Sequence, residues 1–324
     1  MKDSLGYTIR NKWYKKKEDL KQDKYARQSD ILYKRRGGEK VLFIIMFIVF
    51  ALFSFSFIFS LLWVLMNAFK TQIQFGQDSM GWPSPFNFDN FIKAFTTTPS
   101  SSSSSRKSGS TVFEMLGYSV LIAGVGTIVT VFTSSVAAYV VAKYKFPGRG
   151  VIFAVVIFSL IVPIVGALPS QIQLMDKMGL YNKGEVVGIV ACIFLYSGGF
   201  GMNFMLLYSF FKNLSWTYVE AARIDGANDF TIFFRIIIPM AKGPIIAISV
   251  IQLIGLWNDY LTPSIYATKT PTIAVGLFTL QETLRTQQTL LFATIILAIL
   301  PIIILFIAFS KTIMENTSVG GLKG

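Results

Sequence analysis

The sequence contains no histidine and only one cysteine, Cys192. Without histidine the chain has no imidazole for acid–base catalysis or for metal ligation. A single cysteine cannot form a disulfide within the chain, and Cys192 lies inside an apolar run. The sequence also has no GxxxxGK[ST] loop, the motif that cradles the phosphates of ATP. These absences exclude histidine-based chemistry, an internal disulfide and a phosphate loop of this type.

Charged residues are also scarce, at 15% of the chain, whereas 53% of its 324 residues are hydrophobic. The mean hydropathy of +0.56 is too high for an ordinary soluble protein. Several uncharged or nearly uncharged runs are long enough to cross a hydrocarbon core of ~30 Å as a helix. The sequence therefore predicts an all-α polytopic membrane protein with six transmembrane helices, at residues 41–69, 117–142, 151–175, 186–211, 243–268 and 286–310.

Basic residues outnumber acidic ones, 30 to 17, and the net charge of +13 suggests nucleic acid as one class of partner. No zinc-finger spacing and no aromatic–basic RNA module accompanies this charge, and most basic residues flank apolar runs. We therefore expect no nucleic-acid partner. The basic tail at residues 1–40 is instead expected to lie near anionic membrane lipid.

The distribution of basic residues also predicts an orientation in the membrane. The tail, residues 143–149, the loop 212–242 and the C-terminus together carry 22 of the 30 Lys and Arg residues. The loops on the other side carry the remaining 8. Because cytoplasmic loops are enriched in Lys and Arg, both termini and the loop 212–242 should be cytoplasmic. Residues 41–324 then form one transmembrane domain behind a cytoplasmic tail.

The loop 212–242 contains a polar segment between two long apolar runs. Residues 220–224 favour a helix, and Gly226 is suited to end that helix in a left-handed conformation. Thr217, three residues before Glu220, fits a capping box at the start of the same helix.

A second short helix is predicted directly after the first. Asn228 or Asp229 can cap a helix over residues 230–238, and Pro239 should end it. Two interpretations of the paired helices are open. They form a docking element for a partner protein, or they form a solvated connector in which Glu220 only caps its own helix.

Asp259 is the acidic residue that the predicted spans contain. A carboxylate at the bilayer centre costs roughly 2.5–3.5 kcal/mol on insertion scales, so it should face protein or water. In one interpretation Asn258 and Asp259 line a solute path, where Trp257 or Tyr260 stacks on the apolar face of a sugar. In the other, Asn258 and Asp259 bond to neighbouring helices and Trp257 belongs to the core.

Gln171 poses a similar question near the end of the third predicted span. It follows Pro163 and Pro169, and prolines interrupt helices. This stretch is either a broken helix that lines a cavity or simply the external end of the span.

Residues 220–239 resemble the EAA loop of bacterial ABC-importer permeases, which has the form EAAxxDGAxxxxxFxxxxxP. Every specified position of that pattern is present: Glu220, Ala221, Ala222, Asp225, Gly226, Ala227, Phe233 and Pro239. In that family the first short helix is a coupling helix, which sits in a groove of the ATPase subunit. The resemblance therefore favours docking over a simple connector, and it implies the type I permease fold of ABC importers.

Other stretches are similar to permeases of the carbohydrate type. Residues 257–263 resemble their WNDFLWP stretch, with Thr262 in place of the second tryptophan, and residues 137–149 resemble their AAYxxAxxxFPGR stretch. The C-terminal GGLKG is similar to the GGVKG end of the smaller permease of maltose transporters. The resemblance thus implies that Gly321 and Lys323 reach toward the ATPases.

The resemblance implies one subunit of an ATP-driven sugar importer in the bacterial inner membrane. Its partners would be a second homologous permease, two cytoplasmic ATPases and an extracellular solute-binding protein. ATP and Mg would bind to the ATPases, so this subunit should hold no cofactor and no metal and should not be an enzyme. The candidate coupling residues are then Glu220, Ala221, Ala222, Asp225, Gly226, Ala227, Pro239, Gly321 and Lys323, and the candidate path residues are Trp257, Asn258, Asp259, Tyr260 and Gln171.

Two other classes of function are open. Importers of phosphate, amino acids or peptides share the EAA loop, although residues 257–261 and the C-terminus favour sugar. A polytopic membrane enzyme or a channel would also have six apolar spans. An enzyme, however, should show clustered ionisable or metal-binding residues at membrane depth, and Asp259 alone does not form such a cluster.

Overall fold

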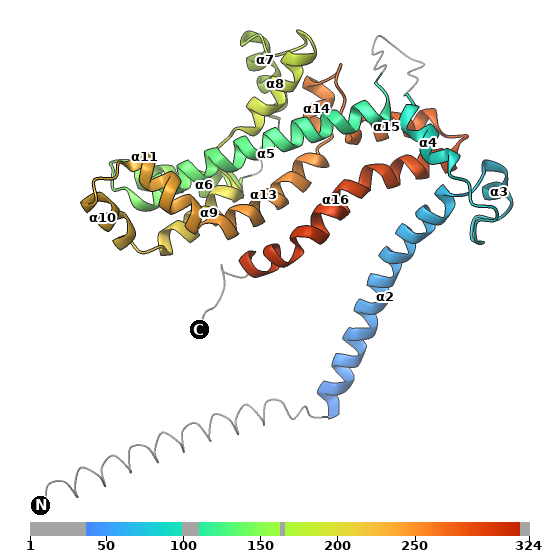
Figure 1. Ribbon diagram of the computed structural model, residues 1–324, viewed down its shortest axis with the longest axis horizontal. Coiled ribbons are helices and arrows are strands. Elements are labelled where there is room, and N and C mark those ends of the chain that lie inside the picture. The colour runs from blue at the N-terminus through green and yellow to red at the C-terminus, as the bar shows by residue number, and fades with distance from the viewer. Residues whose placement is uncertain (1–36, 99–109, 163–165, 318–324) are drawn as a thin grey trace, which may run out of the picture. The chain divides into compact units, whose positions relative to one another are not determined.

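The computed structural model describes residues 37–98, 110–162 and 166–317, and the regular structure within these ranges is entirely helical (Figure 1). The chain divides into two compact units, Met1–Trp63 and Val64–Gly324. In chain order the helices are α2 (Gly37–Ala68), α3 (Gln72–Gln77), α4 (Asp89–Thr96), α5 (Val112–Lys143), α6 (Arg149–Ile161), α7 (Leu168–Lys177), α8 (Glu185–Tyr196), α9 (Met202–Asn213), α10 (Thr217–Ile224), α11 (Asp229–Ile232), η1 (Phe233–Ile237), α12 (Ile238–Met240), α13 (Lys242–Trp257), α14 (Leu261–Tyr266), α15 (Ile273–Thr283) and α16 (Gln288–Thr317). The predicted all-α architecture is confirmed for this part of the chain.

Three helices are long and apolar enough to cross a membrane, namely parts of α2, α5 and α16. The stretch Asp229–Met240 and α13 pass the same test as a pair, but they are bent by 77° at the break between them. The side chains of α2 are exposed from Val41 to Leu62, which suits contact with lipid. The described ranges therefore contain three helices of spanning length, or four if the bent pair counts as one.

The predicted spans at residues 151–175, 186–211 and 243–268 are not single helices. The first consists of α6 and α7, the second of α8 and α9, and the third of α13 and α14. Each break has a local cause in the sequence. Val162 has an extended backbone (φ −86°, ψ 116°) because the proline at position 163 disfavours helix in the residue before it.

The other two breaks depend on glycine and on side-chain hydrogen bonds. α9 starts after Gly201, whose φ of 154° other residues rarely adopt. α13 ends at Trp257, and the side-chain amide of the next residue, Asn258, donates to the carbonyl of Ile254 at 2.8 Å. Such a bond from side chain to backbone competes with continuation of the helix. Apolar length alone therefore overestimated the continuity of these three segments.

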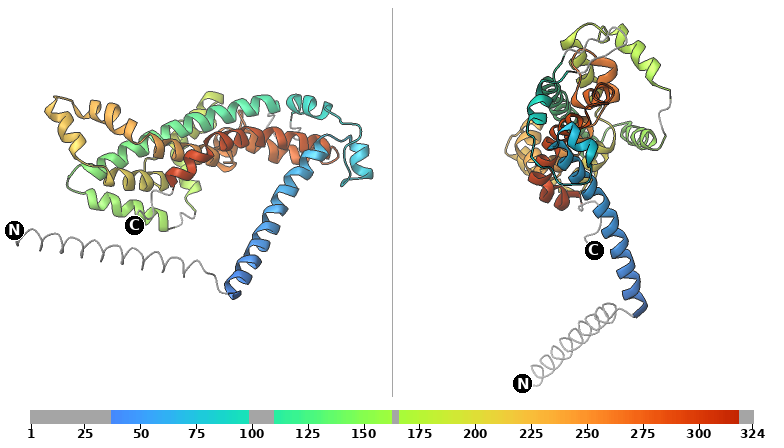
Figure 2. Two further views of the ribbon diagram at one scale, coloured as in Figure 1. Left: turned by 60° about the horizontal axis from the view of Figure 1, so that its bottom comes forward. Right: turned by 90° about the vertical axis from the view of Figure 1, so that its right-hand side faces the viewer.

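α5 is the central helix of the unit Val64–Gly324. It packs against α9 and α13, and α13 also packs against α16 (Figures 1 and 2). The hydroxyl of Thr130 on α5 donates to the carbonyl of Tyr196 at 2.7 Å, so it satisfies a backbone group where α8 ends. At Gly126 a Cβ would lie 2.9 Å from the Tyr196 ring, so only glycine allows this approach.

Different elements cover the two ends of α5. Near its start, the N–H of Val112 donates to the carbonyl of Thr97 at 3.1 Å, and Ala94 of α4 is buried in the same core. Near its end, Tyr139 is buried with residues of α9, α10 and η1. α4 and the pair α10–α11 therefore lie at opposite ends of a helix of 32 residues (Figure 1).

Candidate functional site

α10 ends in a left-handed turn at Gly226, which has a φ of +80°. The N–H of Ala227 donates to the carbonyl of Ala222 at 2.9 Å, and the N–H of Gly226 donates to that of Arg223 at 3.0 Å. These two bonds form the Schellman pattern, which satisfies the last carbonyls of a helix. The predicted stop at Gly226 is confirmed.

The predicted N-terminal cap is present at the second short helix, α11, but not at the first, α10. Asn228 caps α11, because its side-chain oxygen accepts a hydrogen bond from the N–H of Thr231 at 2.8 Å. The capping box predicted for Thr217 is wrong. Thr217 is the first residue of α10, Trp216 holds the cap position, and no side chain caps there. The hydroxyl oxygen of Ser215 accepts from the N–H of Thr217 at 3.3 Å instead.

The second helix does not end at Pro239 as predicted. It continues from α11 through the π turn η1 into α12, and it ends at Met240. Proline has no N–H, and its ring clashes with the carbonyl of the preceding turn in a regular helix. The N–H of Ile238 closes the wider turn by donating to Phe233, which relieves this clash and carries the helix past Pro239.

We use the term docking segment for residues 217–232, which comprise α10, its turn and α11. One face of the segment is fixed to the rest of the chain. Val219 and Ala222 are buried in a core with Tyr139 of α5, and Ala227 packs against the same core. Ala222 therefore packs between the docking segment and the core, and it does not face outward.

The opposite face of the docking segment is open. Glu220, Ala221 and Asp225 are exposed, as are Gly226 and, farther along, Pro239. The predicted coupling residues thus divide into an exposed group and a supporting group formed by Ala222 and Ala227.

Two large apolar residues on the open face were not singled out in the sequence. Ile224 is 87% exposed and Phe230 is 76% exposed. The helical period could have indicated the exposure of Ile224. At ~100° per residue, Ile224 lies about 140° around the helix from the buried Val219. Because large apolar side chains at such exposure are suited to a partner surface, they belong to the candidate site.

A polar contact joins the two helices of the docking segment. The guanidinium of Arg223 donates to the carboxylate of Asp229 at 2.9 Å and also lies 5.7 Å from the centre of the Trp216 ring. The bond from Arg223, followed by one from Tyr144, lowers the pKa of Asp229 below its usual value. Both side chains are exposed, so the contact fixes the geometry of the turn more than it stabilises the fold.

The second candidate region is the break between α13 and α14. Trp257 is buried and its indole N–H donates to the carbonyl of Ala298 at 3.3 Å, so it anchors α13 to α16. Asp259 accepts from the hydroxyl of Tyr196 at 2.7 Å and from the N–H of Thr262 at 3.2 Å. These contacts favour the interpretation in which Trp257 and Asp259 are structural.

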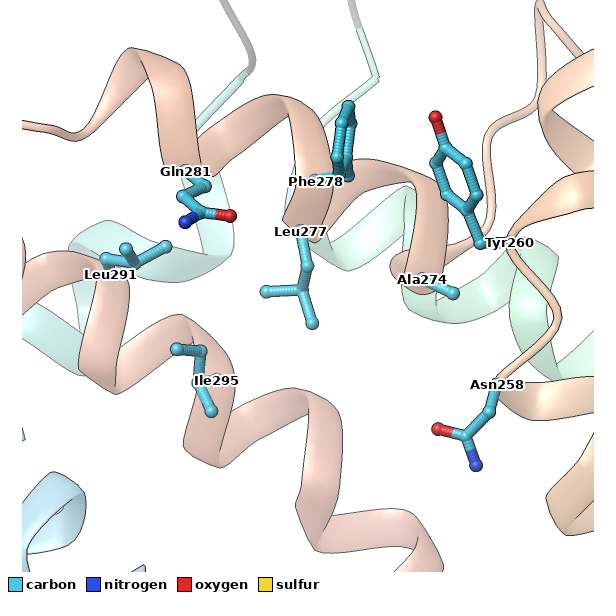
Figure 3. Close-up of a pocket in the computed structure, with 8 residues that line it drawn as sticks. All are labelled: Asn258, Tyr260, Ala274, Leu277, Phe278, Gln281, Leu291 and Ile295. Atoms are coloured by element: carbon cyan, nitrogen blue, oxygen red, sulfur yellow. The ribbon is translucent and has the colours of Figure 1, made fainter. Parts of the chain in front are cut away.

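Asn258 and Tyr260, in contrast, line a cavity of about 450 Å³ (Figure 3). Gln281 on α15 is the third polar residue of its wall. The ring centres of Tyr260 and Phe278 lie 5.1 Å apart. The rest of the wall is aliphatic and comes from α15 and α16: Ala274, Leu277, Leu291 and Ile295.

The remaining predicted residues lie elsewhere. Gln171 is half-buried on α7 and does not line this cavity. Gly321 and Lys323 lie outside the described residues, as does most of the basic tail. Within the described ranges, no group of three or more Cys, Asp or Glu residues could hold a metal ion.

Residues 130–314 match the model of the family described as "Binding-protein-dependent transport system inner membrane component". The chain belongs to this family. Both candidate regions of this permease, the docking segment and the cavity wall, lie within the matched residues.

Individual relatives cover most of the permease. It is 27% identical to the diacetylchitobiose uptake system permease protein NgcG of Streptomyces coelicolor, over 84% of this chain and 86% of that protein. It is 28% identical to the arabinooligosaccharides transport system permease protein AraQ of Halalkalibacterium halodurans, over 90% of this chain and all of that protein (100%). AraQ of Bacillus subtilis is 30% identical over 75% of this chain and 81% of its own length.

A solved structure supports the fold. A chain of a bacterial ABC transporter involved in the import of the acidic polysaccharide alginate superposes with a TM-score of 0.70. The match covers 86% of this permease and 98% of that chain, at 18% sequence identity. The permease therefore has the fold of an ABC importer subunit.

Proposed function

We propose that this membrane protein is one permease subunit of an ATP-driven importer for a sugar or oligosaccharide. The observation that carries the proposal is the docking segment. Its inner face is fixed to the core by Val219 and Ala222, while Glu220, Ile224 and Phe230 remain exposed. A rigid, exposed element of this kind can receive motion from a partner protein and pass it to the transmembrane helices.

The path of that motion runs through α13. The docking segment continues through η1 and α12 to the bend before Lys242, where α13 begins. α13 ends at Trp257, directly before Asn258 in the cavity wall. A displacement of the docking segment would therefore move the helix that ends directly before Asn258 of the cavity wall.

The proposed complex contains a second homologous permease, two cytoplasmic ATPases and an extracellular solute-binding protein. ATP and Mg bind to the ATPases in this proposal, and this subunit contributes no cofactor and no catalytic residue. It lies in the bacterial inner membrane with six spans, three of them broken, and with both termini in the cytoplasm. The excess of basic residues beside the docking segment and in the tail supports this orientation.

Sugar is the proposed solute class because the named relatives transport diacetylchitobiose and arabinooligosaccharides. The aromatic pair of Tyr260 and Phe278 supports it independently, since flat rings can pack against the apolar face of a sugar.

The test is uptake in the native host. Cells that lack this chain, and the same cells that carry a restored copy, are given labelled arabinotriose, maltotriose and diacetylchitobiose. We expect the deletion to abolish ATP-dependent uptake of at least one of these sugars, and the native copy to restore it. A tagged copy should co-purify with a protein that contains a phosphate-loop motif.

Unchanged uptake of every sugar in the deletion strain would contradict the sugar assignment. If no ATPase co-purified either, the importer assignment would fail as well. An ATPase without any sugar phenotype would leave an importer of another solute.

A further inference from the structure

We propose that the cavity beside Asn258 binds the transported sugar directly and selects neutral over acidic saccharides. The inference rests on the proposed function and names its substrate class. It assigns direct contact with the solute to this subunit, through Asn258, Tyr260, Phe278 and Gln281.

The position of the cavity fits a solute path. It lies where α13 stops and α14 starts, and a helix is broken at membrane depth only where protein or a water-filled space satisfies its backbone. Broken helices also form the binding sites of many transporters. The volume of about 450 Å³ lies within the range of small-molecule sites.

The wall offers the two kinds of contact that a sugar ring requires. Tyr260 is 39% exposed and Phe278 is 59% exposed, so both rings present surface for the C–H groups of a pyranose or furanose. Asn258 and Gln281 lie at different ends of the cavity, with Leu277 between them (Figure 3). Each amide has both donor and acceptor atoms, which suits hydroxyl groups.

The local hydrogen bonds hold these groups in place. The Nδ2 of Asn258 donates to the carbonyl of Ile254 at 2.8 Å, which fixes the orientation of the amide. In Figure 3 the side-chain oxygen of Asn258 lies on the cavity side. The position of Tyr260 follows from that of Asp259, which accepts hydrogen bonds from α8 and α14. The site is therefore pre-organised on the side of the helix break.

Charge provides the selectivity. Among the described residues that line the cavity, none is charged. The adjacent Asp259 uses both carboxylate oxygens in bonds to Tyr196 and Thr262, so it offers no cation to an acidic sugar. The carboxylate of a uronic acid would therefore lose its hydration in the cavity without gaining a cation as partner. A neutral sugar has no such charge, so it does not incur this desolvation cost.

The test uses thiol protection in the complete transporter with its binding protein, in proteoliposomes. Phe278→Cys and Gln281→Cys are each made in a Cys192→Ala background, so that the introduced cysteine is the one thiol of the chain. The native thiol is buried. A small maleimide is applied with arabinotriose, maltotriose or diacetylchitobiose, or with digalacturonate as the acidic probe. Phe113→Cys is the matched control, since Phe113 is also exposed on a helix but does not line the cavity.

We expect the sugar that the complex imports to slow labelling at both cavity positions. At ten times the half-protecting concentration the rate should fall about tenfold, because only about one site in eleven is then free. Digalacturonate should leave the rates unchanged, and labelling of Phe113→Cys should respond to neither class.

Several results would overturn the inference. Labelling that is indifferent to an imported sugar, or equal protection by digalacturonate, would remove the binding site or its selectivity. Cavity thiols that do not react in the assembled complex, while Phe113→Cys does, would show that the second permease covers this wall. In each of these cases the complex with native Phe278 and Gln281 still imports its sugar, so the proposed function stands. If that native complex imported none of the neutral probes, the result would count against the proposed function itself.

Discussion

Asp259 is the acidic residue in a largely apolar stretch, and two hydrogen bonds account for its presence there. Its carboxylate accepts from the hydroxyl of Tyr196 and from the N–H of Thr262. The first bond connects α8 to the break after α13, and the second satisfies a backbone donor at the start of α14. A leucine at this position would remove a charge, but it would leave both donors without their acceptor.

We therefore predict that Asp259→Leu destabilises the protein by about 1–3 kcal/mol, the cost of leaving a buried polar group unpaired. Removing this carboxylate from the apolar stretch brings no net gain in stability, because its two hydrogen bonds already compensate for its burial. Adding Tyr196→Phe should cost little more, since that hydroxyl has already lost its partner. The measurement is the fraction of protein that survives heating in detergent, by size-exclusion chromatography.

Asp176→Leu is the matched control for this prediction. Asp176 is exposed on α7, and the protein should tolerate its replacement with little loss of stability. If Asp259→Leu survives heating as well as Asp176→Leu, the two bonds contribute nothing to stability, and the path interpretation of Asp259 regains support.

The turn after α10 depends on the positive φ of Gly226. An added Cβ would meet nothing within 4 Å, so only its φ of +80° opposes a side chain. We expect Gly226→Ala to cost about 1–2 kcal/mol locally and to shift the exit of α10, which weakens retention of the ATPase. Gly150→Ala is the control, because its Cβ also meets nothing and its φ is not positive. Equal ATPase retention by the two variants would show that the turn geometry is unimportant for docking.

At the level of elements, the sequence predicted which segments are apolar helices better than where each helix stops. α5 is continuous over the predicted span 117–142, and α16 is continuous over residues 288–310 of the predicted span 286–310. Pro301 lies inside α16 without breaking it. The breaks at Val162, Gly201 and Asn258 follow from single residues, whose effect a count of apolar length cannot include.

The docking segment was recognisable from its motif, but the roles of its residues were not. A linear pattern gives Ala221 and Ala222 equal weight, whereas the structure exposes the first and buries the second. The cavity was predictable only in part. Asn258 and Tyr260 lie beside the break, but Phe278 and Gln281 come from α15, and only tertiary packing brings them there.

The two faces of the docking segment should respond differently to mutation. Phe230→Ala should reduce ATPase retention by more than about tenfold, since an interface hot spot contributes at least ~2 kcal/mol. It should leave thermal stability unchanged, because Phe230 is 76% exposed in this chain. Ala222→Trp should lower both quantities, since Ala222 is buried against the core.

Phe113→Ala is the control for Phe230→Ala, because it removes an exposed phenylalanine from another part of the protein. Co-purification of the ATPase and survival on heating are measured for all three variants. Retention of the ATPase by Phe230→Ala at the level of the control would place the contact surface elsewhere.

At the scale of the whole molecule, α5 separates two groups of elements. Its 32 residues extend over about 48 Å at ~1.5 Å per residue, which exceeds the ~30 Å hydrocarbon core. α4 packs near the start of α5, and the docking segment packs near its end. If α5 crosses the bilayer, these two groups face opposite compartments.

The charge distribution then decides which compartment each group faces. We predict that Asn228→Cys is labelled only by reagents that reach the cytoplasm, and that Met80→Cys, before α4, is labelled from outside. Both thiols are placed in a Cys192→Ala background, and both native residues are exposed. The measurement is labelling of intact cells and of inverted vesicles with a maleimide that cannot cross membranes. Labelling of both thiols from one side would show that α5 does not span the membrane. A reversed pattern would put the docking segment out of reach of a cytoplasmic ATPase, and ATP hydrolysis could not then drive the proposed coupling.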